Sequence, residues 1–208
     1  MNLTNLANRL GREFRKRRIN RFVRDFDITA NTRVLDLGGT THIWSQANIL
    51  PQLTIVNLTP PLNEPLGNCV HWVVADAVHL PFPDKAFDVV FCNSLIEHLM
   101  NRNNQRCLAQ EIGRVAHRYF VQTPNMRFPV DMHMMVPLFH WLPKTIQRWL
   151  AHFTVWGILS KASRHQGARY VDELCLFTEK ELQQIFPLDE IGREYFFGMV
   201  KSCEIKHQ

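Results

Sequence analysis

The sequence predicts an α/β protein with a doubly wound, mostly parallel sheet, and three observations support this fold class. Short apolar runs alternate with segments of helical spacing from residue 32 to residue 122. The apolar run at residues 33–37 leads directly into Gly38 and Gly39, as expected for a buried strand followed by a tight turn and a helix. Polar residues follow several of the runs, at the strand ends where open parallel sheets bind ligands.

Length and composition indicate one globular domain with attachments. The chain has 208 residues, of which 46% are hydrophobic and 21% charged, as in soluble proteins. The most apolar region, residues 134–159, is interrupted by Pro137, Pro143 and Arg148, so it does not read as a membrane span. Arginines occupy the N-terminal positions where a signal peptide needs an apolar run. We therefore expect a cytoplasmic protein.

The cysteine pattern argues against a cross-linked or zinc-stabilised fold. Five scattered cysteines contain no CxxC pair, which predicts reduced, mostly buried thiols.

Residues 1–26 form a basic amphipathic segment that we expect to be helical, preceding a main domain at residues 27–208. Leu3, Leu6, Leu10 and Phe14 recur at helical spacing. The basic residues around them are Arg9, Arg12, Arg15, Lys16, Arg17, Arg18, Arg21 and Arg24. Such a helix can bind nucleic acid, an acidic membrane surface or an anionic substrate, or it can be a solvated helix packed on the sheet or capping the active site. The segment lacks the aromatic stacking set of single-strand binders, which argues against nucleic acid and leaves peripheral membrane contact open.

The alternating part of the chain gives the sheet and its connections. We expect strands at residues 33–37, 53–58, 70–75, 88–92 and 119–122, and helices at residues 43–50, 93–100 and 104–116. Residues 59–68, with three prolines, and residues 80–87 read as connecting loops.

The pattern changes after Pro124. Residues 128–149 are rich in Pro, Met, His and aromatic side chains, and we expect loops and a helix at about 136–153 within a helical lid insertion at about 124–170. Trp141, Trp149 and Trp156 are assigned to packing. Thr178 and Glu181 predict a capping box for a helix at residues 179–185. Residues 191–197 and 200–206 then predict an antiparallel pair at the sheet edge.

Four stretches resemble one enzyme family. VLDLGGT, VNL, ADAVHLPFPDKAFDVVFCNSLIEHL and RYFVQTPN, in this order, resemble the class I S-adenosylmethionine-dependent methyltransferases, in particular the type 11 group. The resemblance implies a Rossmann-like, seven-stranded sheet with an antiparallel edge pair and helices on both faces. It also implies methyl transfer from S-adenosylmethionine (SAM), with S-adenosylhomocysteine as product. The apolar lid would suit a small-molecule or lipid-like acceptor.

The resemblance assigns cofactor contacts to residues at four strand ends. Gly38 and Gly39 would approach the methionine part of SAM through backbone groups, and Asp36 would orient this turn or meet the cofactor's amino group. Asp76 would accept a hydrogen bond from the adenine amino group or, alternatively, cap a turn. The full set is Asp36, Gly38, Gly39, Thr40, Asn57, Asp76, Ala77 (through its backbone N–H) and Asn93 (at the methionine end).

Three residues depart from the family pattern. Thr40 and His42 stand where the family has further glycines, and Asn57 replaces the acid that holds the ribose hydroxyls. These departures motivate an alternative hypothesis, a non-catalytic binding or scaffold protein on a methyltransferase fold, recruited to nucleic acid or membrane by its basic N-terminus.

Catalytic residues are less defined, because a sulfonium methyl needs alignment more than covalent help. A base is needed only for a protonated acceptor, and His98 and His133 are the candidates, with a structural role as the alternative for each. His133, His140 and Asp131 match no strong ligand spacing, so no metal site is predicted.

Overall fold

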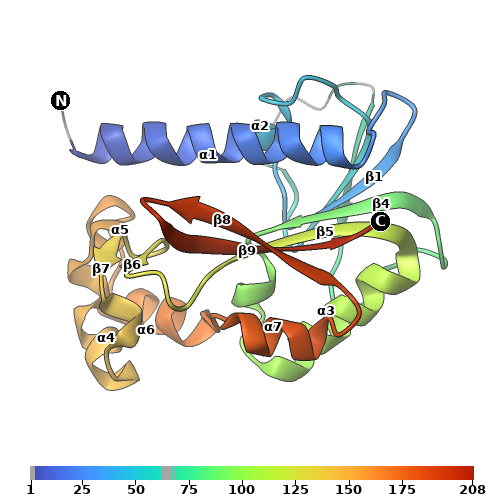
Figure 1. Ribbon diagram of the computed structural model, residues 1–208. Coiled ribbons are helices and arrows are strands. Elements are labelled where there is room, and N and C mark those ends of the chain that lie inside the picture. The colour runs from blue at the N-terminus through green and yellow to red at the C-terminus, as the bar shows by residue number, and fades with distance from the viewer. Residues whose placement is uncertain (1–2, 62–66, 68) are drawn as a thin grey trace. The chain divides into compact units, whose positions relative to one another are not determined.

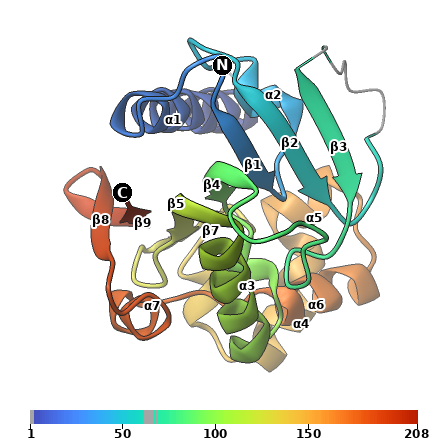
Figure 2. The same ribbon diagram turned by 90° about the vertical axis from the view of Figure 1, so that its right-hand side faces the viewer.

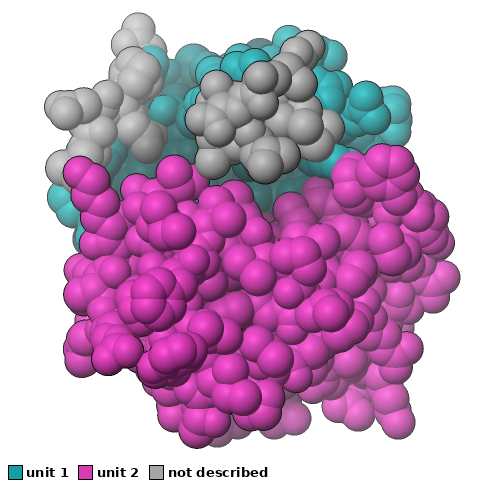
Figure 3. All heavy atoms as spheres, turned by 90° about the vertical axis from the view of Figure 1, so that its left-hand side faces the viewer, with its two compact units in different colours: residues 1–93, 111–120, 207–208 teal, residues 94–110, 121–206 magenta. Residues whose placement is uncertain are grey.

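The computed structural model describes residues 3–61, 67 and 69–208, with side chains from residue 11 onward. The chain divides into two compact units (Figure 3). Unit 1 comprises residues 1–93, 111–120 and 207–208, and unit 2 comprises residues 94–110 and 121–206. The centre of the predicted loop at residues 59–68 and the side chains of Leu3, Leu6, Arg9 and Leu10 lie outside the described residues.

The described strands form a seven-stranded sheet of order β3-β2-β1-β4-β5-β9-β8 (Figure 1). Its strands are β1 (Arg33–Leu37), β2 (Gln52–Asn57), β3 (Val70–Val74), β4 (Phe87–Asn93), β5 (Ala116–Pro124), β8 (Glu190–Phe196) and β9 (Met199–His207). β1 pairs in parallel with β2 and β4, and β2 with β3, whereas β8 and β9 are antiparallel. The predicted fold class, with its antiparallel pair at the sheet edge, is confirmed.

Helices α1 (Leu3–Asp25) and α2 (Thr41–Trp44) cover one face of the unit 1 strands (Figure 2). Ile19, Phe22 and Phe26 of this N-terminal segment are buried against strand residues such as Phe91, and the rings of Phe22 and Phe91 lie 4.8 Å apart. Side chains on the opposite face of the same strands, such as Leu35, are buried as well. The basic N-terminal helix is therefore also a core element, because its apolar stripe belongs to the main hydrophobic cluster.

Two helices around the sheet are shorter than predicted. The helix expected at residues 43–50 is α2, a single turn that ends at Trp44, and the helix expected at 93–100 is η1 (Ile96–His98), one 3₁₀ turn. Ser94 and Met100, with φ of 55° and 58°, break the backbone on either side of η1. The next helix, α3 (Arg102–Val115), begins where the side-chain oxygen of Asn101 accepts the backbone N–H of Asn104.

The region after Pro124 contains several short elements of unit 2 in place of one long helix. They are β6 (Val130–Asp131), β7 (Val136–Pro137), η2 (Phe139–Trp141), α4 (Lys144–Leu150), η3 (Ala151–Phe153), α5 (Val155–Leu159) and α6 (Arg164–Glu173). The predicted helix at 136–153 is wrong at its start, because Val136 and Pro137 pair with β6 and α4 begins only after Pro143. Trp141 and Trp149 are about half exposed, so packing does not account for them.

The end of the chain follows the prediction. Helix α7 (Glu179–Ile185) begins with the expected capping box between Thr178 and Glu181.

All five cysteines are free thiols, of which Cys92 and Cys203 are buried and Cys69 is exposed. Among the described residues, no helix has the length and apolar character that a membrane span requires.

Candidate active site

The polar strand ends of unit 1 meet at one edge of the sheet. Leu37 of β1 is in register with Val56 of β2 and with Cys92 of β4, and Asn57 is in register with Val74 of β3. The residues that follow these positions therefore share the carboxyl edge of the parallel strands. This edge is where open α/β sheets bind ligands.

Gly38 and Gly39 are glycines for two different reasons. Gly38 has φ of 71°, in the left-handed region, and its N–H donates to the carbonyl of Val56 at 2.9 Å. At Gly39, a Cβ would lie 1.8 Å from the Oδ2 atom of Asp36. The second glycine of the turn thus makes room for the carboxyl group beneath it.

Asp36 is a fully buried acid with an incomplete set of hydrogen bonds. Its Oδ2 accepts the indole N–H of Trp44 at 2.7 Å, whereas its Oδ1 has no hydrogen-bond partner among the described residues. Burial raises the pKa of Asp36 to about 7, and the bond from Trp44 offsets only part of that effect. At neutral pH this carboxyl therefore sits near its protonation midpoint.

Asn57 and Thr40 lie beside this turn. The Asn57 amide donates to the carbonyl of Gly39 at 3.2 Å, and its oxygen accepts the N–H of Leu58 at 3.2 Å. Asn57 thus holds the glycine turn as well as ending β2. Thr40 is exposed at the start of α2, and its side chain makes no capping bond there.

Asp76 and Ala77 follow β3. Asp76 is exposed, and its Oδ1 accepts the N–H of Val78 at 3.1 Å. It therefore caps a turn, which is the alternative role that the sequence left open beside the adenine contact. Ala77 is buried. Leu58 and Val74, two apolar residues next to this edge, are 71% and 56% exposed.

Asn93 ends β4 and is bonded to the N-terminal helix. Its Oδ1 accepts a hydrogen bond from the Arg18 guanidinium at 2.7 Å. Arg18 is only 5% exposed, so it does not belong to the solvated basic face. The basic helix therefore contributes a side chain to the same sheet edge.

The two candidate bases lie together in unit 2, beside a buried acid. The rings of His98 and His133 are 4.9 Å apart in an edge-to-face arrangement. Glu97 is fully buried, its Oε2 accepts the hydroxyl of Thr123 at 2.9 Å, and its Oε1 lies 3.6 Å from Nε2 of His133. Burial lowers the pKa of His98, which favours its neutral form.

Asp131 lies on the other side of His133. Its Oδ1 accepts the backbone N–H groups of His133 and Met134 at 2.8 and 2.9 Å and lies 3.8 Å from Nδ1 of His133. Its Oδ2 lies 3.6 Å from Nδ1 of His140. The β6–β7 turn thus holds His133 between two carboxylates.

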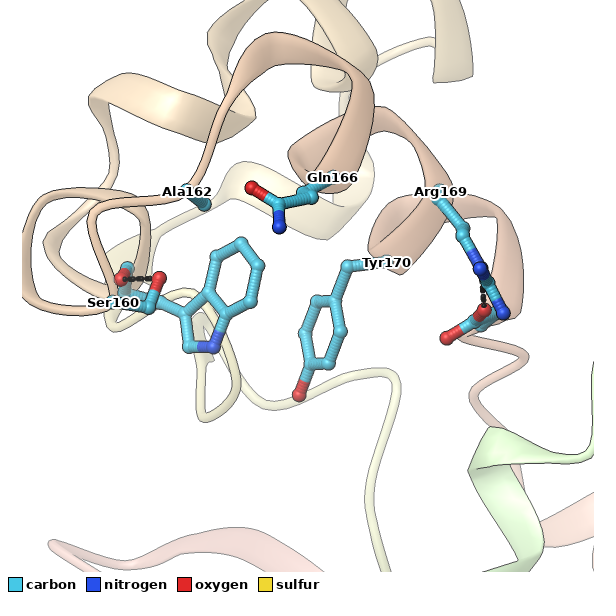
Figure 4. A pocket seen from close by; sticks show the side chains of 7 residues that line it. Ser160, Ala162, Gln166, Arg169 and Tyr170 are labelled. Carbon is cyan, nitrogen blue, oxygen red and sulfur yellow. Dashed lines mark hydrogen bonds and ion pairs between the residues drawn. The ribbon is translucent and has the colours of Figure 1, made fainter.

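A pocket of about 200 Å³ adjoins this cluster within unit 2. The rings of Trp156 and Tyr170 stack at 4.3 Å along it, and Tyr170 also lies 5.9 Å from the ring of His98. Figure 4 shows Gln166, Arg169 and Tyr170 projecting from α6, with Ser160 and Ala162 on the facing loop. The pocket has room for a small, flat molecule.

Three of these residues were not predicted from the sequence. Glu97 has a detectable signal, because it is an acid within the apolar stretch 95–99. The role of Arg18 was hidden among eight basic residues, and the pocket position of Trp156 depends on the fold of the lid region.

Comparisons with known proteins find one family model that matches part of the chain. The family model of the type 11 methyltransferase domain matches residues 37–118. No curated protein matches the chain.

Several solved structures have the same fold at low sequence identity. A SAM-dependent methyltransferase from Methanosarcina mazei is 15% identical, covers 89% of this chain and 94% of its own, and has a TM-score of 0.50. Magnesium protoporphyrin IX methyltransferase from Synechocystis, solved with S-adenosylhomocysteine, is 13% identical and has a TM-score of 0.57; the match covers 100% of this chain and 89% of that one. The 1,6-didemethyltoxoflavin-N1-methyltransferase of Burkholderia thailandensis is 13% identical and has a TM-score of 0.55; the match covers 92% of this chain and 76% of that one.

The sheet order, the glycine turn at the end of β1 and the family match agree. Residues 37–118 therefore match the type 11 methyltransferase domain, and the chain has the class I fold of the SAM-dependent methyltransferases.

Proposed function

We propose that this methyltransferase transfers the methyl group of SAM to a small-molecule or lipid-like acceptor. The observation that carries the proposal is the turn of unit 1, in which Gly38 and Gly39 expose backbone above the buried carboxyl of Asp36. Bound SAM would supply an electrophilic methyl on a positively charged sulfur, which is a good leaving group. The protein then has to bind SAM and the acceptor, orient them toward each other, and exclude water.

We assign the cofactor contacts to the strand ends of unit 1. Asp36 is buried beneath Gly39, so we infer that it shapes the turn without touching SAM. The exposed carboxylate of Asp76 keeps one oxygen for the adenine amino group, since its turn bond uses the other. Asn57 uses one amide N–H on Gly39 and keeps its second for a ribose hydroxyl.

The remaining predicted contacts fit the same arrangement. The backbone of Ala77 would face the adenine ring, Thr40 would lie at the mouth of the turn, and Asn93 would line the methionine end. The Arg18 bond fixes the amide orientation of Asn93, because its oxygen accepts from the guanidinium and its N–H₂ group then points elsewhere.

Two features of unit 2 support the acceptor class. The stacked Trp156 and Tyr170 give the pocket an aromatic wall suited to a small, flat acceptor. Trp149 and Phe153 are 57% and 58% exposed, which favours a lipid-like acceptor or peripheral membrane contact. Flotation with anionic vesicles separates these cases: the double variant Trp149→Ser, Phe153→Ser should lose vesicle binding if the lid region meets lipid.

For an acceptor that must lose a proton, His98 and His133 are the candidate bases. Both rings contact acidic side chains or each other, which suits structural support or ion binding as well as proton transfer.

Calorimetric titration with SAM tests the cofactor assignment. Asp76→Ala should weaken SAM binding about 10- to 100-fold, the effect of one charge-assisted hydrogen bond. Glu190→Ala, which removes an exposed acid at the start of β8, is the matched control and should leave affinity unchanged. Absence of SAM binding at millimolar cofactor, or an unchanged affinity in Asp76→Ala, would contradict the proposal.

A second measurement separates catalysis from the alternative, a non-catalytic protein on the same fold. Incubation with methyl-labelled SAM and fractionated cell extract should yield a labelled small molecule or lipid. SAM binding without any labelled product would favour the non-catalytic alternative.

A further inference from the structure

Glu97, His98 and His133 bring three metal-ligating atoms together. One ligand atom from each of these side chains lies within 4.8 Å of the other two. Nε2 of His133 and Oε1 of Glu97 are 3.6 Å apart. Two ligands at about 2.1 Å from a tetrahedral zinc ion are about 3.4 Å apart, so this pair already has a ligand-like spacing.

Glu97 is a buried acid whose carboxyl group is only partly hydrogen-bonded among the described residues. It is fully buried, and its Oε2 accepts the hydroxyl of Thr123, while its Oε1 accepts no hydrogen bond from the described residues and lies 3.6 Å from Nε2 of His133. Across the residues that the structure describes, no lysine or arginine pairs with Glu97. A buried carboxylate of this kind is stabilised by a nearby cation.

Asp131 lies 3.8 Å from Nδ1 of His133, next to the ring nitrogen that faces away from Glu97 but beyond hydrogen-bond distance. The two ring nitrogens of His133 face different carboxylates, with Nε2 toward Glu97 and Nδ1 toward Asp131. In metal sites, a ligating histidine usually directs its other ring nitrogen to a carboxylate or carbonyl that orients it. Asp131 is itself fixed by two backbone N–H groups.

The backbone that carries Glu97 is held firmly. The carbonyl of Glu97 accepts the N–H of Cys175 at 2.7 Å, and the buried amide of Gln105 donates to the carbonyls of Ile96 and Cys175. Ligands on a rigid backbone lose little entropy when an ion binds.

We propose that Glu97, His98 and His133 bind a divalent first-row transition metal ion, with zinc as the representative. Two imidazoles and one carboxylate are a common ligand set for such ions, and three protein ligands leave a coordination position open. Tyr170 contacts both histidine rings and lines the pocket, so the open position suits an acceptor that carries an oxygen or nitrogen donor. The proposal goes beyond the methyl transfer itself, because the sulfonium needs no metal.

The test is a metal titration of the full-length protein after treatment with a chelator, in the absence of SAM. Calorimetry with Zn²⁺ and visible absorption with Co²⁺ should both show saturation at about one ion per chain. His98→Ala, His133→Ala and Glu97→Gln should each weaken binding by at least about a hundredfold, since loss of a supporting group alone costs 10- to 100-fold. Asp131→Asn should weaken metal binding by the smaller factor of about 10- to 100-fold.

His165→Ala is the matched control, because His165 is an exposed histidine of α6 outside the cluster. If His133→Ala fails to fold, His133→Gln keeps a polar side chain at the position. No saturable binding by the wild-type protein, or equal affinity in the His98 and His133 variants, would overturn the proposal. Either result leaves the SAM titration unaffected, so the two proposals fail independently.

Discussion

Replacing Asp36 by asparagine should stabilise the protein at pH 8 and change its stability little at pH 4. Burial raises the pKa of Asp36 from 3.8 to about 7. Between pH 3.8 and about pH 7, Asp36 holds its proton in the folded protein more tightly than in the unfolded chain. The wild-type protein therefore loses stability as pH rises from about 4 to 7 and reaches a plateau above 7.

The magnitude follows from the size of the shift. A rise of about 3 pKa units corresponds to at most about 4 kcal/mol at pH 8, at about 1.36 kcal/mol per unit. Asparagine carries no charge, and its oxygen can still accept the Trp44 indole N–H. The variant therefore avoids this loss. For a domain of this size, about 4 kcal/mol corresponds to a rise in Tm of about 8 to 16 °C.

Thermal unfolding of both proteins from pH 4 to pH 9, at constant ionic strength, measures the difference. Asp88→Asn is a control of opposite sign, because Arg33 lowers the pKa of the half-exposed Asp88. That variant should lose up to about 1 kcal/mol of stability above pH 5, a loss that disappears as pH falls through the lowered pKa of Asp88. A Tm difference between wild type and Asp36→Asn that does not change with pH would refute this account of Asp36.

Three further predictions concern core packing and helix capping. Gly39→Ala should destabilise the protein by about 1 to 3 kcal/mol, because the added Cβ meets the Asp36 carboxyl. Gly113→Ala is the control: this helical glycine has open space around it, so the variant should be stabilised by up to about 1 kcal/mol. Chemical denaturation measures the free energy of unfolding of both variants. Phe22→Ala should cost about 3 to 5 kcal/mol by the same measurement, and a mild effect would contradict the core role of α1. Thr178→Ala should cost about 1 kcal/mol through loss of the capping box, seen as a lower Tm; an unchanged Tm would argue against it.

The N-terminal helix shows how a sequence pattern can be correct and incomplete. Helical spacing and the basic side chains predicted α1, and Arg12, Lys16 and Arg17 are exposed as expected of a solvated face. Deleting the segment would also remove Phe22 from the core. Recruitment to a membrane or nucleic acid is therefore better tested by neutralising Arg12, Lys16 and Arg17, with vesicle and RNA binding as the readout.

The sequence alone determined the local and ordered features of this protein. Strand alternation, the glycine turn after β1 and the capping box of α7 depend on residues close in the chain, so they could be identified from spacing. The family resemblance followed from the order of these motifs, and the sheet topology agrees with it.

Only the tertiary structure decided what the polar residues contact. Gly39 makes room for Asp36, Asn93 is bonded to Arg18, and Glu97 meets His133 across 36 positions of sequence because η1 and the β6–β7 turn lie together. Such pairings depend on long-range packing and on burial, which sets the charge balance of each group. Local spacing carries no information on either, and for that reason the histidine and carboxylate cluster became visible only in the folded chain.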